Sequence, residues 1–334
     1  MSKSHILRAI FALTLMAGLV DWGGKQAAAE EIVVTNYGVT VNGMPFAVAK
    51  ALGYFEEEGA DVTGILSSSG GGTTIRNLLG GNLAYAESAL PAVVTAVQEG
   101  AELKIIAGNA HTVAEFYWIV MPDSPIQSIE DLKGKKIGFT NPRSTSQALN
   151  VVLLQSIGLE ADEVEPVMTG GFGPMLVALE QGGIDAAPVA DPMYTKNKEK
   201  YRVVVKASEA LPPLTNVVAV TTEEAARTKG DFIRAVIRAR RRAVDFIYEN
   251  PAEAAKLIAP EYDLEVGVTQ EILEALIAST EATGVPYWGP GDIRYEPMDN
   301  MIQVQKDVGA LEGDVNWADL VDESFLPDDL KGSN

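Results

Sequence analysis

The chain has 334 residues, with 46 Asp and Glu against 26 Lys and Arg, two His and no Cys, and its formal net charge is −20 at pH 7. This length predicts about two domains, and it suffices to bury a core without disulfide or metal support. The missing Cys excludes disulfides, Cys-ligated metal sites and thiol nucleophiles. The acidic balance argues against nucleic acid as a partner, because phosphate binding requires clustered Lys and Arg.

Residues 1–29 have the layout of a secretory signal peptide. Lys3 and Arg8 give a positive start, an apolar run covers residues 9–20, and three Ala end the segment. The run is shorter than the roughly 20 residues of a transmembrane helix, so an uncleaved anchor is the lesser alternative. Because the mature chain has no Cys for a lipid anchor, we expect a protein of the Gram-negative periplasm, without membrane insertion.

The first part of the mature chain alternates apolar β-branched runs with helical patterns. Strands are predicted at 32–35, 61–66, 83–86 and 103–107, and helices at 45–57, 73–79 and 90–98. This alternation is typical of the α/β class, in which helices join parallel strands.

A second α/β block lies between two further apolar strands, 116–120 and 217–220. The block has predicted helices at 144–157 and 174–181 and strands at 164–167 and 184–188, and helices at 223–249, 252–258, 269–283 and 298–308 follow it. One unit inserted into another predicts two lobes. We expect lobe 1 to contain residues 30–121 and 216–334, and lobe 2 to contain 122–215. Two strands crossing together would form a hinge, and the cleft between the lobes is the expected ligand site.

Several segments, taken in order and spacing, carry a family resemblance that is clearest over residues 32–192. They are the helix at 46–55, Ser68-Ser69-Gly70 with 76–83, 131–137, the helix start at 144–146, 178–186 and Asp191-Pro192. The chain resembles periplasmic solute-binding proteins of ABC importers, in the branch that binds taurine, aliphatic sulfonates, nitrate and thiamine-precursor pyrimidines. The resemblance implies an α/β, two-lobe type II periplasmic-binding-protein-like fold. It also implies a small-molecule solute and an inner-membrane ABC permease as partners of a monomer.

Catalytic groups are scarce in the mature chain. His111 is its single His, and the sequence contains no Gly-x-Ser-x-Gly, His-Glu-x-x-His or phosphate-loop Lys. We therefore expect no enzyme activity, no cofactor and no metal. His111 itself is interpreted as a loop histidine, with a place in the cleft wall as the alternative.

Four loop-to-helix junctions are candidates for binding an anion. Helix N-termini carry free N–H groups and a partial positive charge, while Gly and hydroxyl side chains add close backbone approach and further donors. The candidates at these junctions are Ser69, Gly70, Ser88, Thr145, Ser146 and Gly171. Ordinary capping and turn formation is the alternative for each of them.

Other polar candidates come from single positions. The resemblance implies that the loop with Asn36 and Tyr37 meets the ligand, with a surface turn as the alternative. Arg143 is the one cation beside a predicted site and would pair with a carboxylate or sulfonate, with a solvent-exposed side chain as the equal alternative. Asp191 would favour an amine or ring N–H, so Arg143 and Asp191 together would suit a zwitterion. Ala190 stands where taurine-type sequences carry an aromatic residue nearby, which argues against taurine itself.

Aromatic residues complete the predicted site. Phe116, Phe172 and Trp288 are candidates for an apolar pocket wall, with core packing as the alternative for Phe116 and a lid position for Trp288. The basic cluster 238–242 is interpreted as the solvent-facing side of an amphipathic helix.

These features favour a solute-binding protein that delivers a sulfonate, carboxylate or pyrimidine-like solute to a permease. The alternatives are an exported module that presents its ligand to a sensor and an enzyme on the same fold.

Overall fold

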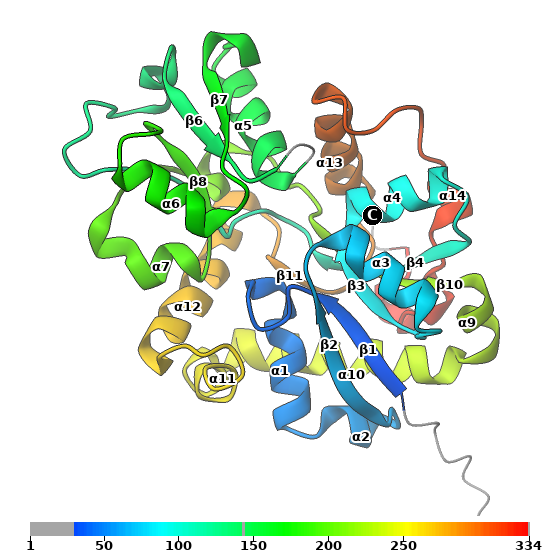
Figure 1. Cartoon of the computed structure of the whole chain (residues 1–334). Coiled ribbons are helices and arrows are strands. Elements are labelled where there is room, and N and C mark those ends of the chain that lie inside the picture. Colours follow the sequence, from blue (N-terminus) through cyan, green and yellow to red (C-terminus); the bar gives the residue numbers. More distant parts are fainter. Residues whose placement is uncertain (1–29, 142–143, 333–334) are drawn as a thin grey trace, which may run out of the picture.

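The computed structural model describes residues 30–141 and 144–332, and its sheets divide them into two regions (Figure 1). The larger region holds a six-stranded sheet with strand order β11-β4-β10-β3-β1-β2. Its strands are β1 (Glu30–Thr35), β2 (Val62–Ser68), β3 (Ala86–Ala89), β4 (Leu103–Ala110), β10 (Val217–Thr222) and β11 (Trp288–Gly291). The predicted signal peptide and Arg143 lie outside the described residues.

The smaller region is the inserted block. It contains a three-stranded sheet of order β8-β5-β9 and a two-stranded sheet of β6 and β7. These strands are β5 (Phe116–Val120), β6 (Lys136–Phe139), β7 (Glu165–Met168), β8 (Ala187–Ala190) and β9 (Arg202–Lys206). An isolated parallel bridge between Ile137 and Ala186 connects the two small sheets.

Helices cover both regions in the order that the apolar periodicity predicts. Those of the larger region are α1 (Met44–Ala51), α2 (Tyr54–Glu58), α3 (Gly71–Gly80), α4 (Leu90–Gln98), α9 (Glu223–Thr228), α10 (Gly230–Glu249), α11 (Pro251–Ile258), α12 (Val266–Thr283), α13 (Tyr295–Asp307) and α14 (Trp317–Leu320). Those of the smaller region are α5 (Thr145–Ser156), α6 (Phe172–Glu180), α7 (Met193–Asn197) and α8 (Ala207–Ala210). The predicted helix at 45–57 forms as two, because Gly53 between them takes a left-handed φ of 71°.

Strand direction is less uniform than the alternating pattern predicts. β1 pairs in parallel with β2 and β3, and β6 pairs in parallel with β7. β10 is antiparallel to both β3 and β4, and β5 is antiparallel to both β8 and β9. Because the chain enters β10 from the inserted block and not from a crossover helix, nothing requires it to run parallel to its neighbours.

The chain passes between the regions at residues 111–115 and 211–216. The two strands predicted to cross there, β5 and β10, lie at the ends of these segments, one in each region. Two further contacts join the regions, since α13 packs on α5 and α12 packs on α7 and α8. An ion pair between Lys198 and Glu271 lies at the second of these contacts.

The two faces of β5 belong to different cores. Phe116, Trp118 and Val120 join the main core, which extends through both regions. Tyr117 and Ile119 point the other way, into a smaller cluster beneath α6. This alternation follows from the two-residue period of a strand.

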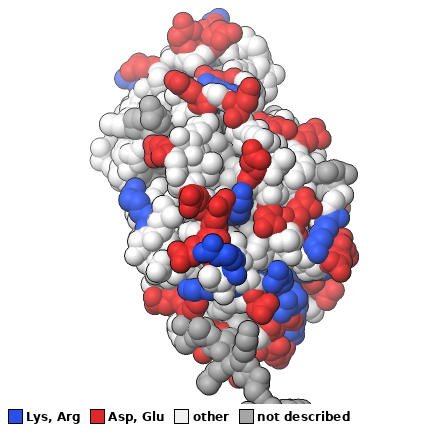
Figure 2. Space-filling view, turned by 90° about the vertical axis from the view of Figure 1, so that its right-hand side faces the viewer, with Lys and Arg blue, Asp and Glu red and all other residues white. Residues whose placement is uncertain are grey.

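Charged side chains are spread over the surface. Figure 2 shows one face on which acidic groups are scattered from end to end and basic groups lie among them. Over residues 30–141 and 144–332, no helix combines the length and apolar character needed to cross a bilayer.

Candidate functional site

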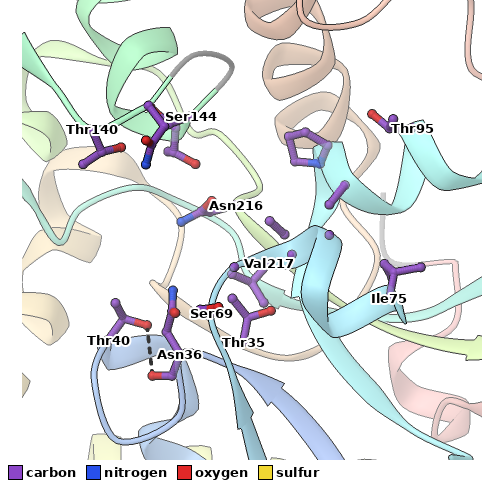
Figure 3. A pocket seen from close by; sticks show the side chains of 18 of the residues that line it. Thr35, Asn36, Thr40, Ser69, Ile75, Thr95, Thr140, Ser144, Asn216 and Val217 are labelled. Carbon is purple, nitrogen blue, oxygen red and sulfur yellow. Dashed lines mark hydrogen bonds between the residues drawn. The ribbon is translucent and has the colours of Figure 1, made fainter. Parts of the chain in front are cut away.

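A cavity of about 1050 Å³ lies between the two regions, and both contribute to its wall. In Figure 3, Thr140 and Ser144 of the smaller region face Asn36 and Ser69 of the larger region, with Asn216 between them. Eight of the sequence-predicted residues line this cavity, namely Asn36, Ser69, Gly70, Phe116, Thr145, Ser146, Gly171 and Phe172.

The larger region contributes the end of β1 and the start of α3. Asn36 takes a left-handed φ of 52°, a conformation that Asn adopts more readily than most residues, and its N–H donates to the Ser68 carbonyl at 2.8 Å. Gly70 takes a left-handed φ of 87° immediately before α3. A Cβ on Gly71 would lie 2.6 Å from the Cβ of Ala92, so only glycine lets α3 approach α4 this closely. The glycines thereby present the N-terminus of α3 to the cavity.

The smaller region contributes hydroxyl groups at the start of α5. The Ser144 Oγ accepts from the Gln147 N–H at 3.3 Å, which is a helix N-cap. The Ser146 Oγ accepts from the Thr140 N–H at 3.0 Å. Capping therefore accounts for part of this chemistry, as the alternative interpretation expects, but the same residues also line the cavity.

An aromatic wall stands beside these polar groups. The ring centroids of Phe116 and Phe172 are 6.2 Å apart at an interplanar angle of 56°. Phe116 begins β5 and Phe172 begins α6, so the wall belongs to the smaller region. It offers an apolar surface to the organic part of a ligand.

Glu115 and Asn216 also line the cavity, and the sequence analysis missed both. They lie in the two segments that connect the regions. The Asn216 Nδ2 donates to Glu115 Oε1 at 3.1 Å, and Glu115 Oε2 has no hydrogen-bond partner among the described residues. Burial raises the pKa of the Glu115 carboxyl to about 8. The sequence signal that could have identified Glu115 is its place as a single acidic residue directly before an apolar strand.

Four predicted site residues lie outside the cavity wall. Tyr37 packs edge-on against Tyr262 with ring centroids 5.7 Å apart, and the Ser88 Oγ donates to the Gly71 carbonyl at 3.4 Å. Trp288 is fully buried, and its indole N–H donates to the Val41 carbonyl at 3.2 Å. These contacts place Trp288 in the core of the larger region.

Asp191, the fourth of these residues, is held within the smaller region. Its carboxylate accepts from the Tyr117 hydroxyl at 3.0 Å and from the Thr195 hydroxyl at 2.6 Å. Burial raises its pKa to about 6, and these hydrogen bonds oppose that rise. Arg143, its predicted counterpart for a zwitterion, lies outside the described residues.

His111 is fully buried and does not face the cavity, so the structure replaces the expected loop histidine with a core one. Its Nε2 lies 2.9 Å from Asp292 Oδ1. Burial alone would raise the pKa of Asp292, but His111 and Arg294 lower it to about 2. Within the described part of the chain, no group of three or more His, Asp or Glu side chains is placed to hold a metal ion.

The basic cluster corrects a second expectation. Arg238 and Arg242 pair with Glu58 at the surface, as a solvent-facing helix side predicts. Arg240 is buried instead, with its Nη atoms donating to the Gly289 and Asn109 carbonyls, both at 2.7 Å. The cluster is therefore divided between the surface and the core.

Comparison with known proteins identifies the family and the fold to which the chain belongs. The model of a family described as NMT1/THI5 like matches residues 40–254. No curated protein matches the chain. Many solved structures resemble it along most of its length.

The periplasmic aliphatic sulphonate binding protein SsuA of Escherichia coli has a TM-score of 0.70 at 20% identity, covering 83% of this chain and 90% of that chain. The alkanesulfonate-binding protein SsuA of Xanthomonas axonopodis pv. citri, bound to MOPS, has a TM-score of 0.70 at 18% identity, covering 89% and 98%. The desulfurization enzyme DSZB has a TM-score of 0.61 at 13% identity, covering 88% and 97%. At these identities the likeness establishes the fold, and the predicted two-lobe α/β fold of type II periplasmic binding proteins is confirmed.

Proposed function

Because the chain belongs to the NMT1/THI5-like family, we propose that it is the periplasmic solute-binding component of an ABC importer. It binds a small polar organic solute between its two regions and delivers it to an inner-membrane permease. The observation that carries this proposal is the cavity of about 1050 Å³, whose wall combines helix starts, hydroxyl groups and an aromatic pair from both regions.

Closure of the cleft would complete the site. We propose that the larger and the smaller region move as two lobes about the connecting segments, which Glu115 and Asn216 occupy. The lobe boundary expected at residue 121 therefore moves to the residues before β5, because β5 pairs with β8 and β9 of the smaller region. The cavity is at the upper end of the usual size for small-molecule sites, so closure would bring the two half-walls onto a smaller ligand and exclude water.

The hydrogen-bonding groups and aromatic rings of the cavity wall suffice for the affinity that a solute-binding protein requires. A dissociation constant near 1 µM corresponds to about −8.2 kcal/mol. A handful of hydrogen bonds at roughly 0.5–3 kcal/mol each, together with burial against the aromatic pair, supplies this after the cost of ordering the solute.

An enzyme on the same fold has less support than a binding protein. The chain has no Cys, and its single mature His lies outside the cavity in contact with Asp292. The likeness to a desulfurization enzyme at 13% identity concerns the fold.

Thermal-shift screening tests the proposal. The purified mature chain is heated with alkanesulfonates, aminosulfonates, carboxylates, pyrimidines and nitrate, one at a time. A bound solute at about 100 times its dissociation constant stabilises the folded state by about 2.7 kcal/mol and raises Tm by several degrees. A screen in which no small solute raises Tm would contradict solute binding.

A further inference from the structure

Glu115 is unusual among the charged residues of the cleft. Arg76, Glu99 and Glu115 are the charged residues among the described cavity lining. Arg76 and Glu99 are exposed at its margin, where the Arg76 Nη2 donates to the Thr73 hydroxyl at 2.8 Å. Glu115 is 5% exposed, so among the described cavity lining its carboxyl is the one ionisable group that a solute would meet after leaving water.

The surroundings fix the position of this carboxyl. The backbone carbonyl of Glu115 accepts from the Asp191 N–H at 2.9 Å, and the Phe116 N–H donates to the Val113 carbonyl at 3.0 Å. The Asn216 amide holds Oε1 at 3.1 Å. The side chain is therefore anchored at one oxygen. Oε2 makes no hydrogen bond of normal geometry among the described residues, although the Tyr287 hydroxyl, which also makes none, acts on the same carboxyl.

A carboxyl oxygen that is held in place and lacks a hydrogen-bond partner can accept from a bound donor. Burial favours the protonated carboxyl in the ligand-free protein, and an ammonium or N–H donor at Oε2 favours the ionised form instead. Burying a polar atom without a hydrogen bond costs free energy, and a ligand N–H placed at that atom recovers it. Such a site also rejects close analogues that lack the donor, because their binding would leave the carboxylate unpaired. Glu115 thus has the burial, position and free acceptor expected of a specificity-determining residue.

We propose that Glu115 selects a solute that carries a nitrogen hydrogen-bond donor, an amine or an amino-substituted ring, and that this N–H binds Oε2. This inference rests on the proposed function and narrows its solute class. The organic part of the solute lies against Phe116, the next residue along the chain. Acceptor atoms at its other end face the helix starts near Ser69 and Thr145, which offer N–H and hydroxyl donors.

A simple anion fits the same place only if Glu115 is protonated and donates to it. The two binding modes, an N–H donor at Oε2 and an anion at a protonated carboxyl, predict opposite effects of the substitution Glu115→Gln. If the Asn216 amide keeps its bond to the remaining oxygen, the new amide NH₂ replaces Oε2 and becomes a donor. Glu115→Gln therefore removes the acceptor that an N–H needs and preserves a donor for an anion.

Matched solute pairs test the proposal on the wild-type protein. Each pair differs by one amino group: ethanesulfonate against 2-aminoethanesulfonate, propionate against 3-aminopropionate, and 2-methylpyrimidine against 4-amino-2-methylpyrimidine. Isothermal titration calorimetry gives the dissociation constants. We expect the best-binding pair to favour its amino member by about tenfold or more.

The variants then locate the effect. Glu115→Gln weakens the amino member by about tenfold or more. Glu281→Gln, which makes the same change on the exposed surface of α12 and away from the cavity lining, leaves its affinity within about twofold. The comparison of solute pairs needs no variant, so it remains decisive if Glu115→Gln fails to fold.

Each outcome has one meaning. Equal binding of both members of the best pair overturns the role of Glu115 and leaves solute binding intact, as does unchanged affinity in a folded Glu115→Gln protein. Tighter binding of the anion without an amino group, retained in Glu115→Gln, replaces the proposed mode with a protonated carboxyl. No binding by any of the six solutes, together with a negative broad screen, contradicts the proposed function itself.

Discussion

The Nε atom of Arg240 lies 3.4 Å from Oε2 of Glu87, and both side chains are shielded from solvent. The carboxylate of Glu87 also accepts from the amides of Asn42 at 2.9 Å and Asn109 at 2.6 Å. Arg240 in turn donates to the carbonyls of Asn109 and Gly289. Because Asn42 lines the cavity, this network ties the wall of the cleft to α10 and to three strands of the larger sheet.

We predict that Arg240→Leu destabilises the protein by about 3–5 kcal/mol, because the charge of Glu87 is then left buried without its cation. Urea denaturation followed by circular dichroism measures the change. Arg241→Leu, one residue along the same helix, is the matched control. Its partner Asp329 is largely exposed, so the loss is about 1 kcal/mol or less. A similar small loss for both variants would contradict a structural role for the buried pair.

The position of Arg240 was predictable from helical phase, although the basic cluster as a whole suggested a surface. The apolar residues Ile233, Val236 and Val244 lie at spacings of three and eight residues along the helix. Arg240 lies four residues from both Val236 and Val244, so it falls on the same face. Its partner was not predictable. Glu87 is 153 positions away in β3, and only the assembled sheet brings the two charges together.

The raised pKa of Glu115 predicts a pH dependence of stability. Its ordinary value is 4.5, and burial raises the pKa in the folded protein to about 8. The hydrogen bond from Asn216 and the nearby Tyr287 hydroxyl, which makes no hydrogen bond of normal geometry, oppose this rise, and the charge of Asp191 adds to it. Between these values the folded state binds more protons than the unfolded state, so stability falls as pH rises. The slope approaches about 1.4 kcal/mol per pH unit from this group.

Denaturation of the ligand-free protein at several pH values between 5 and 8 measures this slope. Glu115→Gln removes the titrating group, and we expect the difference in unfolding free energy between variant and wild type to grow with pH. Glu281→Gln should follow the wild type throughout. A difference independent of pH would show that Glu115 titrates normally.

Gly289 is predicted to tolerate no side chain. A Cβ at this position would lie 2.1 Å from Nε2 of His111 and 2.9 Å from the Gly108 carbonyl. Gly289→Ala therefore destabilises the protein by about 1–3 kcal/mol or more. Gly267→Ala in α12 is the control, because nothing lies within 4 Å of the added Cβ, and the change gains about 0.5–1 kcal/mol. Thermal unfolding distinguishes the two, and equal Tm values would contradict the predicted clash.

Helices and strands with a strong apolar periodicity were predictable from the sequence. An element whose residue types disfavour its own secondary structure was not. α10 and α13 follow from their apolar spacing, but β11 has the sequence Trp-Gly-Pro-Gly, whose Gly and Pro disfavour a strand. It forms because it lies beside β4 and closes that edge of the sheet.

The candidate site also contains residues that were predictable from the sequence and residues that were not. Helix starts such as Gly70 and Thr145 carry a local signature and line the cavity. Trp288 and Asp191 have equally suggestive local sequences, yet their partners lie in the core. Local sequence reports which residues are able to bind a ligand, while the direction of each side chain depends on distant packing.

The most direct test of solute binding in the cleft is calorimetric titration of the tightest solute from the screen into three proteins. Thr145→Trp places a large side chain at the start of α5, inside the cavity wall, and Ser156→Trp places the same side chain at the exposed end of the same helix. We predict that the wild type and Ser156→Trp bind with dissociation constants within about twofold of each other, and that Thr145→Trp binds at least about a hundredfold more weakly. Unchanged affinity in a folded Thr145→Trp protein would place the solute elsewhere and contradict the account.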